Sequence, residues 1–129
     1  MGDKDLKDIA IWRIWTYRAR VRWVYDGDTY RVDIDLGFRQ WLIDAKVRLA
    51  YVNCPEIKGP ERPIGLQARD AVKGLVTAGD IRLRLIDPDP GKYGRYIAQI
   101  WYWSGYHWQD LSQTLLQLGL ARRYQGALA

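Results

Sequence analysis

Four short fragments of the sequence carry side chains whose types suit chemistry on phosphate. They are residues 26–29 (DGDT), 48–56 (RLAYVNCPE), 92–95 (KYGR) and 119–124 (GLARRY). Carboxylate and amide oxygens are the ligands that hard cations prefer, and guanidinium groups bind phosphate oxygens in pairs. Phosphodiester cleavage needs both kinds of group, because negative charge grows on the phosphate oxygens in the transition state. The fragments therefore indicate metal-assisted phosphate chemistry, provided that they meet in space.

Each fragment alone also has an ordinary structural explanation. Asp-Gly is the favoured dipeptide of a tight hairpin turn, so residues 26–29 could be a turn and nothing more. Charged residues commonly flank strands, which would account for residues 48–56. Residues 92–95 could be a basic turn after a proline-rich loop, and the arginines of residues 119–124 could cap a helix dipole. The chemical interpretation depends on the four fragments occurring together.

The elements that must position these fragments begin with two strands that have one polar face. Residues 17–23 and residues 30–36 both alternate between apolar and charged side chains. This period of two is typical of strands with one solvated face. The side chains predicted to face inward are Tyr17, Ala19, Val21, Trp23, Tyr30, Val32, Ile34 and Leu36.

The pairing register of these strands follows from their apolar faces. The faces coincide only if the numbers of paired residues sum to an odd number, as in Arg22 with Asp33 and Arg20 with Asp35. That register predicts a four-residue loop or a bulge between the strands. Because it opposes arginines to aspartates, we interpret the arginine row as ion pairs, each worth only about a few tenths of a kcal/mol. The alternative interpretation is a track for nucleic acid.

The rest of the chain predicts two helices and three more strands. A third strand is expected over residues 38–52 and is closed by Pro55, and further strands are expected over residues 81–85 and 96–103. A helix over residues 64–78, capped by Gly79, has an apolar stripe. Its members are Ile64, Ala68, Ala71, Val72, Leu75 and Val76.

A last helix begins after Asp110, the expected N-cap. It places Leu111, Leu115 and Leu118 on one face and ends at Gly119. The order βββαββα predicts a mainly β fold with helices, in the α+β class. Its architecture is a five-stranded OB-type Greek-key barrel with a helix after strand three and a C-terminal helix.

Size and composition favour one domain over residues 1–129. A chain of 129 residues can bury a core without disulfides, and Cys54 is the only cysteine. Lys and Arg number 20 against 15 Asp and Glu, and the resulting charge of +5 favours polyanionic partners or serves solubility alone. Seven Trp and nine Tyr exceed the needs of so small a core, so some of these rings are expected at the surface.

The N-terminal residues carry no targeting signal of a known type. The apolar run at residues 9–15 is interrupted by Arg13 and is too short for a signal peptide. We expect residues 1–10 to be disordered or loosely packed, and no segment to span a membrane. The chain as written is expected in the cytoplasm, with secretion open if a leader was removed.

Together and in this order, the four fragments resemble the staphylococcal nuclease (thermonuclease) family. The resemblance runs from about Tyr17 to Gly126 and is closest to the phage and bacterial branch, through residues 35–38 with Trp41 and through Gly65-Leu66. It implies an OB-type barrel, a monomer, and a Ca²⁺-dependent endonuclease that cleaves DNA or RNA and leaves 3′-phosphate ends.

The resemblance also implies the groups that hold the metal and activate water. Asp28 resembles the carboxylate ligand of Ca²⁺, with Asp26 beside it as a supporting charge. Cys54 stands where a main-chain carbonyl meets the metal. Glu56 matches the glutamate that positions or deprotonates the attacking water.

Phosphate and substrate contacts follow from the same resemblance. Arg48 and Arg95 match the two arginines that bind the scissile phosphate. Lys92 and Tyr93 match residues that touch the other phosphate of the nucleotide, and Tyr124 lies where a C-terminal tyrosine approaches the substrate.

The chain departs from the family pattern at Asn53, where better-known members have aspartate as a second acidic ligand. An amide oxygen still suits a hard cation, but affinity falls with ligand charge. We therefore expect Asn53 to be a metal ligand in a weak Ca²⁺ site, with a Kd of about 10⁻⁴ M or weaker before substrate binds. Cys54 as a nucleophile and His107 as a zinc ligand are assigned no chemistry, because neither has the partner residues it would need.

Two other functions compete with the nuclease interpretation. An OB barrel with a degenerate nuclease site could bind single-stranded nucleic acid without cleaving it, as the aromatic excess and Asn53 would suit. The presence of Asp28, Arg48, Glu56 and Arg95 favours the enzyme, because binding alone does not require them. A protein-interaction module would instead show no affinity for nucleic acid at moderate salt.

Overall fold

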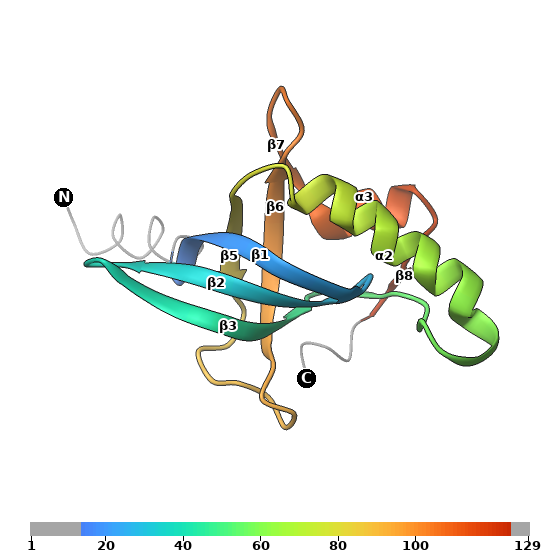
Figure 1. The fold of residues 1–129 in the computed structure, drawn as a ribbon, viewed down its shortest axis with the longest axis horizontal. Coiled ribbons are helices and arrows are strands. Elements are labelled where there is room, and N and C mark those ends of the chain that lie inside the picture. Colours follow the sequence, from blue (N-terminus) through green and yellow to red (C-terminus); the bar gives the residue numbers. More distant parts are fainter. Residues whose placement is uncertain (1–13, 125–129) are drawn as a thin grey trace, which may run out of the picture.

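The strands close into a five-stranded barrel in the computed structural model, which describes residues 14–124 (Figure 1). Their order is β3-β2-β1-β5-β6, and a parallel pairing between β3 and β6 closes the barrel. The mainly β, OB-type fold with two helices predicted from the sequence is confirmed. The barrel strands are β1 (Thr16–Asp26), β2 (Thr29–Gly37), β3 (Gln40–Leu49), β5 (Ile81–Leu85) and β6 (Tyr96–Trp103).

Smaller elements complete the described part of the chain. The two-residue strands β4 (Val52–Asn53) and β8 (Arg122–Arg123) pair with each other, and β7 (Trp108–Asp110) extends the sheet beyond β6. The sequence did not predict β4 as a separate strand, nor β7 and β8, because strands of two or three residues are too short to show a period. The expectation for residues 1–10 lies outside the described residues. Neither helix within residues 14–124 is long and apolar enough to cross a membrane.

Helix α2 (Arg62–Val76) follows the 3₁₀ turn η1 (Gly59–Glu61) and packs against β1. It buries Ala68, Val72 and Val76 as the sequence predicted, whereas Ile64 is exposed in the first turn. The predicted cap at Gly79 is wrong. The helix ends at Val76, and Thr77 caps it by donating from its N–H and its hydroxyl to the Lys73 carbonyl, so no left-handed glycine is needed.

Helix α3 (Leu111–Gln117) begins and ends where the sequence predicted. The Asp110 carboxylate accepts a hydrogen bond from the Gln113 N–H, and Gly119 adopts a φ of 71°, the left-handed conformation of a C-cap. Leu111 and Leu115 are fully buried. Leu118 is exposed, contrary to the prediction, because it lies at the C-cap position, where the chain turns away.

The buried face of β2 agrees with its alternation, but the end of the strand does not. Tyr30, Val32 and Ile34 are buried, while Leu36 is exposed near the β2–β3 turn. In that turn Phe38 and Arg39 both have positive φ, so the third strand begins at Gln40 rather than at residue 38.

Two bulges in β1 change the predicted pairing with β2. Ala19, Arg20 and Val21 pair with partners whose numbers do sum to an odd value, but Arg20 pairs with Asp33 rather than Asp35. The register shifts between Val21 and Trp23 and again between Val24 and Asp26. An extra residue reverses which face the following side chains occupy. Trp23 is therefore exposed and Val24 buried, contrary to the prediction for Trp23.

The arginines of β1 form ion pairs, as the sequence suggested, but of the two pairs named from the sequence only Arg22 with Asp33 is found. Arg18 meets Asp35 at 2.7 Å and Arg22 meets Asp33 at 2.8 Å. Arg20 instead pairs with Asp80, at 3.0 Å. These contacts favour the ion-pair interpretation of the arginine row over a nucleic-acid track. Several aromatic rings lie at the surface, as composition indicated, among them Trp23, Tyr25, Tyr93, Trp103 and Tyr106.

The predicted third strand is divided in two. β3 ends at Leu49, and Tyr51 has a φ of 74°, which breaks the strand before β4 resumes at Val52. The break turns the chain toward the open end of the barrel. Arg48 and Asn53 therefore lie on different strands, β3 and β4, but their side chains are in contact.

Candidate active site

The four sequence fragments line one cavity of about 480 Å³. The β1–β2 turn, the β3–β4 segment, the loop before β6 and the chain after β8 each contribute to it. All ten residues singled out from the sequence are in its lining, and their chemical roles stay predictions. They are Asp26, Asp28, Arg48, Asn53, Cys54, Glu56, Lys92, Tyr93, Arg95 and Tyr124.

Asp28 is held rigidly in the turn between β1 and β2. Its Oδ2 accepts a hydrogen bond of 2.7 Å from the Cys54 N–H, and its Oδ1 accepts one of 3.2 Å from the Thr29 hydroxyl. The Asp28 N–H in turn donates to Asp26 Oδ1 at 3.0 Å. Only 6% of Asp28 is exposed, so both the position and the orientation of its carboxylate are fixed.

Gly27 allows this turn to lie against the chain at Cys54. A Cβ at residue 27 would be 2.6 Å from Cys54 Sγ and 2.7 Å from Cys54 Cβ, which is closer than atoms can pack. The glycine of the Asp-Gly pair thus serves a close approach as well as a turn. That approach brings the Cys54 backbone to Asp28.

Two carboxylates and a thiol share this half-buried corner. Burial and the negative charge of Asp28 raise the pKa of Asp26 to about 6. The same corner raises the pKa of the Cys54 thiol to about 12, mainly through burial and then through Asp28. Cys54 is therefore a neutral thiol near neutral pH, unsuited to nucleophilic attack.

Arg48 is nearly buried and is tied to its own segment. One Nη donates to the carbonyls of Leu49 at 2.6 Å and Val52 at 2.9 Å, and the other donates to Asn53 Oδ1 at 3.2 Å. These bonds use three of the five N–H donors of a guanidinium. The second Nη also lies 3.6 Å from Asp28 Oδ2 and partly balances the acidic charge.

Glu56 is exposed, and its backbone is fixed by the start of α2. Its N–H donates to Glu61 Oε2 at 3.1 Å. A Cβ at residue 65 would overlap the Glu56 carbonyl, so only glycine lets the helix approach this closely. Gly65 therefore determines where the Glu56 side chain begins.

The opposite wall of the cavity is basic and has few internal contacts. The Arg95 guanidinium lies 5.5 Å from the centre of the Tyr93 ring, and Lys92 Nζ lies 5.8 Å from it. Within residues 14–124 no carboxylate forms an ion pair with Arg95 or Lys92. Their positive charges are thus available to an anion.

Tyr124 completes the cavity at the other end of the chain. Its N–H donates to the Tyr51 carbonyl at 2.8 Å, and Arg48 lies 5.4 Å from the centre of its ring. The β4–β8 pairing places it there, across the cavity from the basic loop.

The donors on the acidic side suit a hard cation. They are carboxylates, an amide and a main-chain carbonyl, all of them oxygen ligands of the kind Ca²⁺ prefers. Across residues 14–124 no three Asp, Glu, His or Cys side chains gather into a metal cluster. The remaining ligands of a cation would therefore have to be neutral oxygens, and affinity falls with ligand charge.

No role was predicted for Thr29, although this residue belongs to the turn fragment at residues 26–29. Its hydroxyl orients Asp28, and it also lines the cavity. Its position directly after two aspartates in a turn could have indicated a hydroxyl that orients one of them. Gly65 was singled out only as part of the family resemblance, and its close approach to Glu56 was not predicted, because it depends on how α2 meets the chain there.

Two comparisons with known proteins bear on the family of this chain. Residues 46–128 match the family model described as staphylococcal nuclease homologue. The chain is also similar to a protein of Leptosphaeria maculans named probable endonuclease LCL3, with 32% identity over 91 residues. That alignment covers 66% of this chain and 30% of the fungal protein, so the chain spans less than a third of that relative. The phage and bacterial branch stays a prediction. The family model covers more than half of the chain, and this protein therefore belongs to the staphylococcal nuclease family.

Proposed function

We propose that this protein is a Ca²⁺-dependent nuclease that hydrolyses phosphodiester bonds of DNA or RNA. The observation that carries the proposal is the convergence of acidic groups and arginines on one cavity of about 480 Å³. Asp26, Asp28 and Glu56 line it together with Arg95 and with Arg48, whose Nη lies 3.6 Å from Asp28 Oδ2. A module that only binds nucleic acid has no use for three acids beside the phosphate.

The residues that would hold the metal are Asp28, Asp26, Asn53 through its amide oxygen and Cys54 through its carbonyl. Bound there, Ca²⁺ would neutralise charge that grows on the phosphate oxygens. The hydrogen bonds from Cys54 and Thr29 keep Asp28 in place without consuming every lone pair of its carboxylate.

The arginines would bind the scissile phosphate from two directions. Arg48 keeps two N–H groups that no internal hydrogen bond uses, and its bonds to Leu49 and Val52 fix its orientation. Arg95 can approach from the basic wall. Donors that are already oriented stabilise the transition state without paying for reorganisation at the moment of reaction.

Glu56 would accept the proton of the attacking water. The water oxygen would bond to phosphorus as the P–O5′ bond breaks. The leaving O5′ would take up a proton from solvent and Glu56 would release its proton to solvent, which leaves a 3′-phosphate and a 5′-hydroxyl. Lys92, Tyr93 and Tyr124 line the same cavity and would contact the flanking parts of the substrate.

The first experiment compares cleavage in Ca²⁺ and in chelator. Single-stranded DNA, duplex DNA and RNA are each incubated with the wild type and with Glu56→Gln. We expect cleavage by the wild type only in Ca²⁺, and a loss on the order of 10² to 10⁴ in rate for Glu56→Gln, the usual contribution of a general base. The products should become extendable by a polymerase only after phosphatase treatment.

A second candidate function is retention of single strands without cleavage. The neutral Asn53 in the metal site and the exposed Trp23 and Tyr25 favour it. Binding of the oligonucleotides by the wild type with no cleavage in Ca²⁺ would support this module. Absence of binding at moderate salt would instead leave a protein-interaction module.

A further inference from the structure

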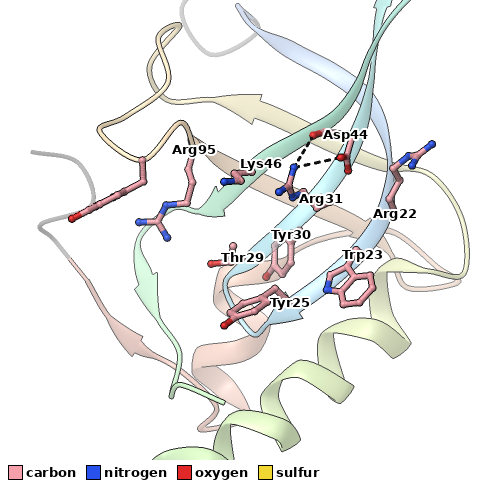
Figure 2. Close-up of a pocket in the computed structure, with 10 residues that line it drawn as sticks. Arg22, Trp23, Tyr25, Thr29, Tyr30, Arg31, Asp44, Lys46 and Arg95 are labelled. Atoms are coloured by element: carbon pink, nitrogen blue, oxygen red, sulfur yellow. Dashed lines mark hydrogen bonds and ion pairs between the residues drawn. The ribbon is translucent and has the colours of Figure 1, made fainter. Parts of the chain in front are cut away.

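A second cavity, of about 860 Å³, adjoins the candidate active site on the outer face of β1, β2 and β3 (Figure 2). Thr29, Tyr93 and Arg95 line both cavities, so the two adjoin at these residues. In Figure 2 Arg95 lies at one end, and Trp23 and Tyr25 lie toward the other. A chain bound in the active site could therefore continue into this groove.

The aromatic end of the groove is created by the bulges of β1. The register shift after Val21 turns Trp23 outward, where 63% of it is exposed, and Tyr25 follows on the same face with 43% exposed. Bulges occur preferentially beside active sites, where they redirect a side chain. Large rings held at the surface beside a cavity offer flat faces for stacking.

Positive charge lies beside these rings. Trp23 pairs with Arg31 in the β1–β2 ladder, and Arg31 pairs with Lys46 in the β2–β3 ladder, so the three side chains form one row across the sheet. With strands spaced about 4.8 Å apart, this row spans about 10 Å. A ring at one end and an ammonium at the other suit a base and its phosphate.

Not all of this charge is available. Arg31 is paired with Asp44 at 3.4 Å, and Arg22 with Asp33 at 2.8 Å. Lys46 has no ion-pair partner within residues 14–124, and neither has Arg95 at the junction of the two cavities. The groove therefore presents two available positive charges, at Lys46 and at Arg95, together with the aromatic rings of Trp23 and Tyr25.

We propose that this groove is a subsite for unpaired nucleotides adjoining the bond to be cleaved. Trp23 and Tyr25 stack on bases, and Lys46 contacts a phosphate. The proposal rests on the proposed function, which places the scissile phosphate at Arg95, where the groove begins. Because the bases inside a duplex are already stacked on their neighbours, whereas those of a single strand can turn out to meet a ring, the groove favours single strands over duplexes.

The test compares Trp23→Ala with Trp103→Ala. Trp103 is a matched control: it is also about half exposed, but it lies on the β6–β7 hairpin, at the opposite end of β6 from the loop that carries Lys92 (Figure 1). KM is measured on a single-stranded oligonucleotide of about ten nucleotides, which is long enough to cover an OB barrel. A chromogenic phosphodiester of one nucleotide serves as the short substrate.

Trp23→Ala should raise KM for the oligonucleotide by about 5- to 100-fold, the fold-change that corresponds to loss of one stacked base. The increase should be confined to the long substrate, and Trp103→Ala should match the wild type on both. Equal KM values for the two variants on the oligonucleotide, or an equal increase on both substrates for Trp23→Ala, would overturn the proposal.

A binding assay separates this proposal from the proposed function. Fluorescence anisotropy of a labelled single strand is measured with Glu56→Gln and with the double variant that also carries Trp23→Ala. The Glu56→Gln change keeps the strand intact, so binding is measured without cleavage. If the wild type does not cleave but Trp23→Ala still weakens binding 5-fold or more, the groove stands and the nuclease proposal fails. If the wild type cleaves and a duplex binds as tightly as a single strand, the groove proposal fails alone.

Discussion

The two walls of the candidate active site are built in opposite ways. On the acidic wall Asp28, Arg48 and Cys54 are each less than a tenth exposed, and each is hydrogen-bonded to a neighbour. On the basic wall Lys92 and Tyr93 are exposed in a loop. The half-buried Arg95 guanidinium lies 5.5 Å from the centre of the Tyr93 ring and forms no ion pair among the described residues. One wall is fixed by the fold, and the other is free to adjust.

This difference follows from what each wall must do. Like charges such as Asp26 and Asp28 stay close together only if the surrounding backbone holds them there. The raised pKa of Asp26, caused first by burial and then by the charge of Asp28, records this cost. A phosphate that enters from solvent is instead met by side chains that can move toward it. The comparison predicts that mutations of the acidic wall change both folding and catalysis, whereas those of the basic wall change catalysis alone.

Among the substitutions that compare the two walls, the largest effect should come from the two arginines. Arg48→Ala and Arg95→Ala should each lower kcat/KM on the order of 10² to 10³, because each removes a donor to the transition state. Arg48→Ala should also lower the free energy of unfolding by about 1 to 3 kcal/mol, since it leaves the buried Leu49 and Val52 carbonyls without a donor. Denaturant unfolding and steady-state kinetics measure the two quantities.

Arg95→Ala is the matched control for stability. It should unfold within about 0.5 kcal/mol of the wild type, as is usual for a side chain with no internal partner. Equal stability of the two variants would contradict the division between a fixed and a free wall. Cleavage close to wild type by either variant would remove that arginine from the site.

A second effect tests how the acidic wall is supported. Gly65→Ala places a methyl group against the Glu56 carbonyl, so α2 and the Glu56 segment must separate. We expect about 1 to 3 kcal/mol of destabilisation from overpacking. A displacement of about 1 Å at Glu56 should lower kcat on the order of 10².

Gly74→Ala is the control in the same helix. Nothing lies within 4 Å of a Cβ at residue 74, so this change should stabilise the helix by up to about 1 kcal/mol and leave kcat unaltered. If both variants are stabilised alike, the close approach at Gly65 does not constrain the Glu56 segment.

The sequence predicted the barrel because its strands bury one face each. Alternation in β2 and the apolar stripe of α2 placed Val32, Val72 and their neighbours in the core correctly. The register predicted a loop or a bulge between β1 and β2, but it did not show that the register shifts after Val21, before Trp23. The error at Trp23 hid the aromatic groove, since a ring assigned to the core cannot be considered as a binding surface.

The resemblance identified the residues of the candidate site, and the fold showed how they are brought together. The ten side chains are far apart along the chain, and only the closure of β3 on β6 and the pairing of β4 with β8 bring them to one cavity. The internal hydrogen bonds of Arg48 could not have been anticipated, because they depend on the break at Tyr51.

The smallest effect concerns the charge of the acidic wall. Asn53→Asp adds a carboxylate beside Asp28 and should tighten Ca²⁺ binding on the order of tenfold, because affinity rises with ligand charge. The gain is limited because Arg48 Nη2 already lies 3.2 Å from Asn53 Oδ1 and would pair with the new charge. Calorimetric titration with CaCl₂ compares the two proteins, and Asn53→Ala should bind more weakly than either. If all three proteins bind Ca²⁺ with the same affinity, residue 53 is not a metal ligand, and the hydrogen bond from Arg48 alone accounts for the position of the Asn53 side chain.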